Sequence, residues 1–390
     1  MIKKDYPLSN SEFLKTGLEK PMENGMQLSL NYRRAQGVQE YNNIKTSEQG
    51  EVLVGLKIPI FALTQEMNGA KRNLYAARLN TKKMDYIAQD KMRFLYFDVL
   101  TSYYKMLYFY ESETLILELL NSSKKRVEII KKRVEVGSIA RLSLLEARQQ
   151  IINREQRYTS IQNKSENALK IFLKYLNMQE PFFKENFTLP LLSHIKDSYV
   201  KETISEEMAL AERTDLKVLT NDLKQFDLEH KYNSVQKYPK LDIGLYGVHD
   251  FEYENGFKVT LAMSFPIQRR SYISRDLEIK KSIQNINKMK EKKEITIKTN
   301  LSIIQNSIRT VLKNLENSKL EVALVQELEE AENKKYNVGL SNLFMVNQRE
   351  IYTLQIKKKL LKYNLDYLLY QQEIHKIMGK SLDVFAAETH

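Results

Sequence analysis

One stretch decides the fold of this chain: RVEVGSIARLSLLEAR, residues 133–148. Apolar residues recur at helical spacing on both sides of it, and Val136, Gly137 and Ser138 interrupt the two patterns. Glycine directly after a helix whose last turn carries Lys and Arg is a common stop signal, because glycine adopts the left-handed conformation without strain. The stretch therefore predicts two helices joined by a tight turn, with Ser138 or Ser143 capping the second helix.

A similar pattern returns later in the chain as KKYNVGLSNLFMVNQR, residues 334–349. Val-Gly, a serine, a leucine and an arginine recur there in the same order. Self-similarity at a fixed distance indicates internal duplication. We interpret the two stretches as equivalent helical-hairpin tips of one duplicated protein.

The composition favours long amphipathic helices over a compact sandwich. The 390 residues include only 12 Gly and 7 Pro, and 28% are charged. There is no Cys, which excludes disulfides and thiolate sites, and the five His are scattered without metal-ligand spacing. No phosphate-binding loop or nucleophile elbow occurs. We therefore predict no enzyme activity, no cofactor and no metal site.

The net charge of +12 raises the question of an anionic partner. Lys and Arg are mixed with Glu and Asp along nearly every predicted helix, which favours solvated helix faces over a nucleic-acid or lipid-binding surface. The sequence shows neither an apolar run long enough for a transmembrane helix nor a signal peptide.

Each half of the chain repeats the same order of two strands, a long helix, a tip and a shorter helix. The first repeat, residues 1–190, is predicted to contain strands at ~26–61 and helices at ~62–136 and ~142–178. The second, residues 191–390, adds a helix at ~205–236 before strands at ~241–267 and helices at ~272–336 and ~342–379. Residues 9–19 fit a short helix, and a short strand is expected near 186–191.

Two of these features do not fit a single globule. A helix of ~75 residues would be ~110 Å long, which suits a coiled coil or a tube wall. Four strands cannot close a barrel and would leave two bare edges. The sheet is therefore expected either to pack on something or to be closed by several copies of the chain together.

These features resemble the TolC-like outer-membrane efflux proteins. The resemblance rests on the two tips at 133–148 and 336–349, on the strand-ending Pro59 and Pro266, and on AERTDL at 211–216, which opens a helix ending at Tyr238-Pro239. It spans about residues 25–379. Their order along the chain makes the resemblance more specific than any one motif.

The resemblance implies a mainly α fold in which a long coiled-coil tube is joined to a four-stranded contribution to a trimeric transmembrane β-barrel. It implies a homotrimer in the outer membrane that reaches into the periplasm and forms the exit duct of a tripartite efflux pump or type I secretion system. The implied partners are outer-membrane lipid, a periplasmic adaptor protein and, through it, an inner-membrane pump, with no nucleic acid. The conduit would be passive and opened by helix movement at its periplasmic end.

The resemblance also implies that the tips dock the adaptor. The corresponding residues are Val136, Gly137, Ser138, Ile139, Arg141 and Leu142 in the first tip and Val338, Gly339, Leu340, Ser341 and Leu343 in the second. Ile139, Leu142, Leu340 and Leu343 are expected to be exposed. The family's acidic gate positions correspond to Phe344 and Asn347, so a gate here would be a hydrophobic constriction; alternatively, Phe344 packs between helices.

The sequence departs from the family pattern at its start, where the signal peptide and the counterpart of helix ~205–236 are missing. The expectations are an N-terminally truncated gene product or a degraded, non-functional duct. The alternatives are a soluble coiled-coil scaffold, a nucleic-acid-associated helical protein or a periplasmic adaptor. The two strand pairs argue against the first two, and two hairpins argue against an adaptor.

Overall fold

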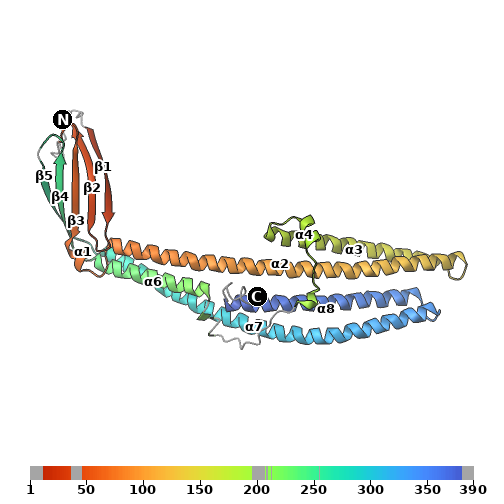
Figure 1. The fold of residues 1–390 in the computed structure, drawn as a ribbon. Helices are drawn as coiled ribbons and strands as arrows, with labels where there is room; N and C mark the ends of the chain where they lie inside the picture. Colours follow the sequence, from red (N-terminus) through yellow and green to blue (C-terminus); the bar gives the residue numbers. More distant parts are fainter. Residues whose placement is uncertain are drawn as a thin grey trace, which may run out of the picture. The chain divides into compact units, whose positions relative to one another are not determined.

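The computed structural model describes residues 12–36, 46–195, 207, 210, 211, 213–253 and 255–379. The described residues form one sheet and a set of long helices (Figure 1). They divide into two compact units. The first unit, Met1–Ile87 with Asp215–Lys292, contains the sheet and is called the sheet unit. The second, Ala88–Thr214 with Lys293–His390, is called the helical unit.

The sheet has five antiparallel strands in the order β1-β2-β3-β4-β5. Their bounds are β1 Glu12–Pro21, β2 Gln27–Gln36, β3 Glu51–Pro59, β4 Lys240–Asp250 and β5 Gly256–Ser264. The central pair, β3 and β4, joins the two halves of the sequence in one register that runs from Glu51 opposite Asp250 to Pro59 opposite Asp242. The mainly helical class with an antiparallel sheet is confirmed, and the sheet has one strand more than the four that the sequence predicted.

The additional strand is β1, where the sequence predicted a short helix over residues 9–19; the first three of these lie outside the described residues. The spacing of Phe13, Leu14 and Leu18 is compatible with a helix or with a strand, and pairing with β2 determines that the segment is a strand. The turn between the strands is fixed locally. Gly25 has φ +92, and the Asn24 Oδ1 accepts a hydrogen bond from the Met26 amide at 3.0 Å.

The described helices are α1 Ile60–Thr64, α2 Gly69–Glu135, α3 Arg141–Leu176, α4 Glu180–Asn186, η1 Leu192–His194, α6 Thr214–Val235, α7 Arg270–Asn337 and α8 Leu343–Met378. The predicted continuous helix from residue 62 is wrong, because α1 ends before α2 begins. Asn68 accepts a hydrogen bond from the Lys71 amide at 2.9 Å and so caps the start of α2. The predicted helix start at Ser205 lies outside the described residues.

The prediction of a strand near residues 186–191 is also wrong. Glu180–Asn186 form the helix α4, which has proline at its start, where a helix tolerates it best. Within the described segment 46–195, residues 187–191 form no strand.

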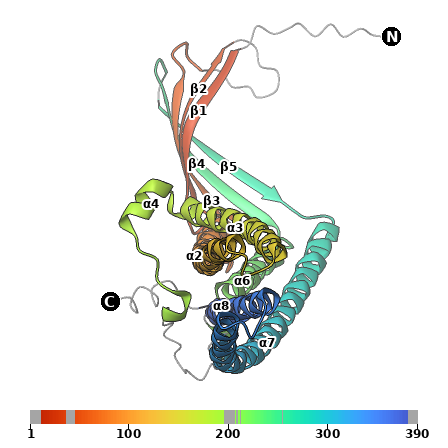
Figure 2. The ribbon, with the colours of Figure 1, turned by 90° about the vertical axis from the view of Figure 1, so that its right-hand side faces the viewer.

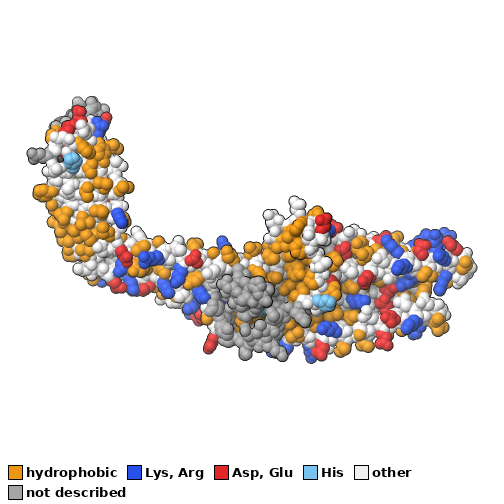
Figure 3. Space-filling model, viewed as in Figure 1, with side chains coloured by type: hydrophobic (Ala, Val, Ile, Leu, Met, Phe, Trp, Pro, Cys, Tyr) orange, Lys and Arg blue, Asp and Glu red, His pale blue; other side chains and the backbone are white. Residues whose placement is uncertain are grey.

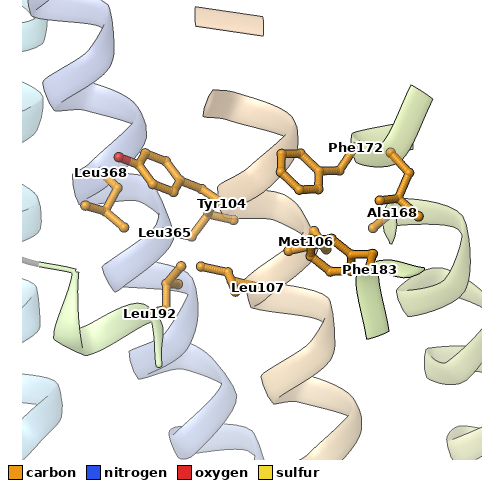
Figure 4. Close-up of a cluster of buried hydrophobic side chains, with 10 residues drawn as sticks. Tyr104, Met106, Leu107, Ala168, Phe172, Phe183, Leu192, Leu365 and Leu368 are labelled. Carbon is orange, nitrogen blue, oxygen red and sulfur yellow. The ribbon is translucent and has the colours of Figure 1, made fainter. Parts of the chain in front are cut away.

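In the helical unit, α2 lies beside α3, and α7 beside α8 (Figure 2). The main core joins both pairs: Tyr104 and Leu107 of α2 pack with Phe172 of α3 and with Leu365 and Leu368 of α8 (Figure 4). Phe183 of α4 and Leu192 of η1 complete this core. The short elements α4 and η1 therefore pack against the side of the long helices and close this core.

Candidate functional site

The sheet carries one strongly apolar face. Because side chains alternate along a strand, the register sorts them into two faces. One face, called the apolar face, holds Leu28, Leu30, Val54, Leu56, Leu241, Ile243, Leu245, Phe257, Val259, Leu261 and Met263. Most of its members are exposed in the isolated chain, up to 70% for Leu261 and 87% for Phe257, whereas Leu56, Leu241 and Ile243 are half-buried. Figure 3 shows hydrophobic side chains gathered over the strands. Such a surface is far more apolar than water-facing sheets usually are.

The opposite face of the sheet is polar and internally paired. Ser29 and Asn31 are buried there. Arg33 forms an ion pair with Glu51, and the Lys57 Nζ lies 2.8 Å from the Asp242 Oδ2. Apolar side chains outward and polar side chains on the other face are the alternation of a strand that separates hydrocarbon from water.

In the part of the chain that the structure describes, no helix carries a stretch that is long and apolar enough to cross a bilayer. The same residues hold no cluster of three or more His, Cys, Asp or Glu side chains suited to a metal ion.

The two predicted tips have the same backbone geometry. At the first, the Gly137 amide donates to the Val134 carbonyl at 3.0 Å and the Ser138 amide to the Arg133 carbonyl at 2.9 Å. At the second, Gly339 donates to Tyr336 at 3.1 Å and Leu340 to Lys335 at 2.9 Å. The glycines have φ +74 and +80. Both helices therefore end in a Schellman motif, in which the glycine takes the left-handed position.

The helices that follow the tips begin differently. At the second tip, Asn342 caps α8, its Oδ1 accepting from the Met345 amide at 3.0 Å. At the first, the cap position of α3 is Ala140, which offers no side-chain acceptor. The prediction that Ser138 or Ser143 caps this helix is wrong. The Ser138 hydroxyl instead donates to the Arg133 carbonyl at 2.8 Å, across the turn.

Most of the predicted docking residues are exposed at the tips. Val136 and Leu142 are 78% and 64% exposed, and Val338 and Leu340 are 71% and 79% exposed. Arg141 is also exposed, whereas Ser341 is half-buried and hydrogen-bonded to Glu332. Apart from the glycine itself and its two chain neighbours, no atom lies within 4 Å of a Cβ built on Gly137 or Gly339. The space around both glycines is open.

Two apolar tip residues point inward instead. Leu343 is only 5% exposed, and packs with Val127 and Ile130 of α2 and with Ala147 of α3. Ile139 is half-buried against the same cluster. The expectation of an exposed Leu343 is therefore wrong, because the first turn of α8 turns this side chain into the core between the helices.

The two candidate gate residues lie in different surroundings. Phe344 is 62% exposed, so it does not pack between the helices of this chain. Asn347 is buried, and its Oδ1 accepts a hydrogen bond from the Arg154 Nη2 at 3.1 Å.

That hydrogen bond leads to a feature that the sequence did not reveal, an ion cluster of Arg126, Arg154 and Glu350. The Glu350 Oε2 accepts from the Arg126 Nη1 at 2.9 Å and from the Arg154 Nη2 at 2.8 Å. Arg154 also donates to the Ser123 hydroxyl. The Arg154 and Glu350 side chains are each 3% exposed. The cluster ties α8 to both α2 and α3.

The electrostatics of the cluster follow from burial and pairing. Burial alone would raise the pKa of Glu350, but hydrogen bonds and charge from Arg126 and Arg154 outweigh it and hold this pKa below its ordinary value. Burial lowers the pKa of Arg154, an effect that Glu350 only partly offsets. Glu350 is thus an ionised carboxylate whose removal would leave the buried guanidinium group of Arg154 and the half-buried one of Arg126 without this counter-charge.

A pattern in the sequence could have pointed to Glu350. It lies in one helical stripe with Leu343, Val346 and Leu354, all buried. A carboxylate in an otherwise apolar stripe faces the core and requires a cationic partner. The identity of the partners could not be read in this way, because Arg126 and Arg154 lie on other helices.

Residues 25–176 match the family model described as outer membrane efflux protein. The chain contains an outer membrane efflux protein domain. The matched segment includes β2, β3, α2, the first tip and α3. The resemblance to TolC-like outer-membrane efflux proteins is confirmed.

The fold of nearly the whole chain is similar to that of several solved outer membrane channels. The CmeC outer membrane channel of Campylobacter jejuni is 13% identical, with a TM-score of 0.74 over 98% of this chain and 81% of that one. The outer membrane protein VceC of Vibrio cholerae is 12% identical, with a TM-score of 0.74 over 96% and 87%. The open state of the MtrE channel of Neisseria gonorrhoeae is 14% identical, with a TM-score of 0.73 over 96% and 81%. No curated protein matches the sequence.

Proposed function

We propose that the chain is a subunit of an outer-membrane exit duct, a passive conduit of a tripartite efflux pump or type I secretion system and not an enzyme. The sheet carries the proposal: an exposed apolar face backed by a paired polar face, in a chain with an outer membrane efflux protein domain. Hydrocarbon would meet the apolar face, and an aqueous lumen the polar face. The helical unit, with a core of its own, would reach into the periplasm.

The edges of the sheet support a homotrimer. A sheet that is open at both edges exposes unpaired backbone groups, which a bilayer does not tolerate. Three copies of the four strands β2–β5 would supply twelve strands, a number that closes a barrel with a lumen. The two halves of the chain, residues 1–190 and 191–390, would then act as structural repeats, each contributing one hairpin tip.

The tips would dock a periplasmic adaptor, which in turn contacts the inner-membrane pump. Val136, Leu142, Val338 and Leu340 supply the exposed apolar contact, with Ser138, Arg141 and Ser341 beside them. The open space around Gly137 and Gly339 would let a partner backbone approach closely. Ile139 and Leu343 support the tips from within.

Opening would involve the ion cluster. Glu350 holds α8 against α2 and α3, so a movement of α8 that widens the periplasmic end must carry both arginines along or break these bonds. Phe344, exposed one turn before Asn347, would form a hydrophobic constriction at that end.

Planar-bilayer recording tests the duct. The full chain, purified in detergent and added to a bilayer bathed in potassium chloride, should give discrete conductance steps, and chemical cross-linking of the same sample should give trimers. A sample that yields neither trimers nor steps would sink the proposal.

Adaptor docking is tested separately in cells that carry the cognate pump. Gly137→Trp should abolish efflux while leaving trimers in the outer membrane, because a large side chain occupies the docking space. The matched control is Ile152→Trp, at an exposed position on α3 away from the tip. Normal efflux with Gly137→Trp would remove the tip from the docking surface.

A further inference from the structure

The two edges of the sheet are occupied very differently. β1 forms one edge and β5 the other (Figure 1). All ten residues of β1 are exposed, so this strand adds nothing to a core and is held to β2 by its backbone ladder, from Glu12 opposite Gln36 to Pro21 opposite Gln27. β5 is also exposed, but its residues on the apolar face are Phe257, Val259, Leu261 and Met263.

Strand direction makes β1 incompatible with a closed antiparallel sheet of several copies. Each neighbouring pair in the chain is antiparallel, so β1, β3 and β5 run one way and β2 and β4 the other. Rotation about a barrel axis preserves strand direction. Copies joined through β1 and β5 would therefore pair in parallel, whereas copies joined through β2 and β5 pair antiparallel like every other pair in the sheet.

The side chains of β1 also make this strand unsuited to a closed sheet of several copies. The register places Lys20 opposite Leu28, in the row that continues through Leu56, Leu245 and Val259. The ammonium group of Lys20 therefore interrupts a row that is otherwise apolar across the whole sheet. Charged side chains and proline are typical of edge strands that prevent further pairing, and a charge on a lipid-facing surface is unfavourable.

We propose that β1 is a displaceable cap: it occupies the edge of β2 in the single chain and leaves when β5 of a second copy takes its place. The proposal rests on the trimeric duct proposed above. The incoming β5 runs in the same direction as β1, has nine residues against ten, and replaces Lys20 with an apolar strand. One backbone ladder is exchanged for another of similar length, so displacement loses few hydrogen bonds. Until then the cap prevents wrong pairing at this edge.

A disulfide lock tests the displacement, because the natural chain has no Cys. Leu18→Cys with Leu30→Cys joins β1 to β2 at directly opposed positions on the apolar face. The matched control is Leu245→Cys with Val259→Cys, also directly opposed on that face, which joins β4 to β5. Both full-length variants are oxidised as monomers in detergent, transferred to phosphatidylcholine vesicles and cross-linked to count trimers, with and without reductant.

The locked β1 variant should give about a tenth of the control's trimers or fewer, and should recover on reduction. Trimers in equal yield from the oxidised β1 variant and the oxidised control would overturn the displacement and leave the duct standing. An absence of trimers from the unmodified chain and both reduced variants would overturn the duct, and the displacement with it.

Loosening β1 should have the opposite effect. A Cβ at Gly17 would clash with the Asn31 side chain and lie 2.6 Å from the Leu30 carbonyl oxygen, both on β2. Gly17→Ala should therefore weaken the β1–β2 pair, touch none of β3–β5 and speed trimer formation in vesicles. Assembly slower than that of the unmodified chain would contradict a cap that has to leave.

Discussion

The two units place their polar and apolar side chains in opposite ways. In the sheet unit, Leu261 and Phe257 are exposed while Ser29 and Asn31 are buried. In the helical unit, Leu107 and Leu368 are buried, and charged side chains are mixed with apolar ones on the surface that Figure 3 shows. Under the proposed function, the exposed apolar side chains of the strands face hydrocarbon, whereas the helices bury apolar side chains in a core of their own. The buried ion cluster is the exception inside the helical unit.

The largest predicted effect comes from removing the negative charge of the buried ion cluster. Glu350→Gln leaves the buried Arg154 and the half-buried Arg126 without this counter-charge and should lower the free energy of unfolding by about 3–5 kcal/mol. Denaturant unfolding in detergent, followed by circular dichroism, measures the change. Glu155→Gln is the control, since Glu155 pairs with Lys124 between the same helices α2 and α3 but both side chains are about half-exposed. It should cost under about 1 kcal/mol. Equal losses would contradict a special role for burial.

The next largest effect compares a charge on the apolar face of the sheet with a charge on its polar face. Leu261→Arg places a charge on the apolar face and should destabilise the chain in vesicles by about 2–4 kcal/mol if the residue sits near the bilayer centre. Ala262→Arg is the matched control, because Ala262 lies opposite Asp242 on the polar face. Reversible unfolding in phospholipid vesicles compares the two. A smaller loss for Leu261→Arg than for Ala262→Arg would mean that the faces are assigned the wrong way round.

How far the sequence predicts these features depends on how local each one is. Gly137 and Gly339 were predicted because a Schellman turn is encoded within a few residues. The strand β1 was not, because Phe13, Leu14 and Leu18 fit both periods and only pairing with β2 decides between them. The ion cluster was missed because its members lie on separate helices, so the apolar stripe that marks Glu350 as a core residue does not identify Arg126 and Arg154 as its partners.

A pH dependence sharpens the role of Glu350. The pKa of Glu350 in the folded chain lies below the ordinary value of 4.5. Between the folded and the ordinary value, the unfolded chain binds more protons than the folded chain, so the free energy of unfolding rises with pH. The stability from this carboxylate is present above the ordinary value and is lost as the pH falls through the folded value. The difference in unfolding free energy between the natural chain and Glu350→Gln should therefore be largest near neutral pH and shrink in acid. A difference that grows in acid would contradict this.

The smallest effect compares the two tips. Asn342→Ala removes the cap of α8 and should cost about 1 kcal/mol. Ala140→Asn supplies the missing cap of α3, whose cap position already has the extended backbone with φ −67 and ψ 144, and should stabilise by a similar amount. Thermal unfolding of the two variants in detergent should shift in opposite directions. Shifts of the same sign would show that the tips differ in more than their caps.

The most direct measurement of the central claim reports which side of the sheet meets lipid. Single cysteines replace Leu261 or Ala262, each carries an environment-sensitive fluorophore, and the full chain is placed in vesicles of phosphatidylcholine with brominated acyl chains. We predict strong quenching by the brominated lipid at Leu261→Cys and little at the neighbouring Ala262→Cys. Weak lipid quenching at both positions, with equal quenching of both by aqueous iodide, would contradict a membrane-inserted sheet.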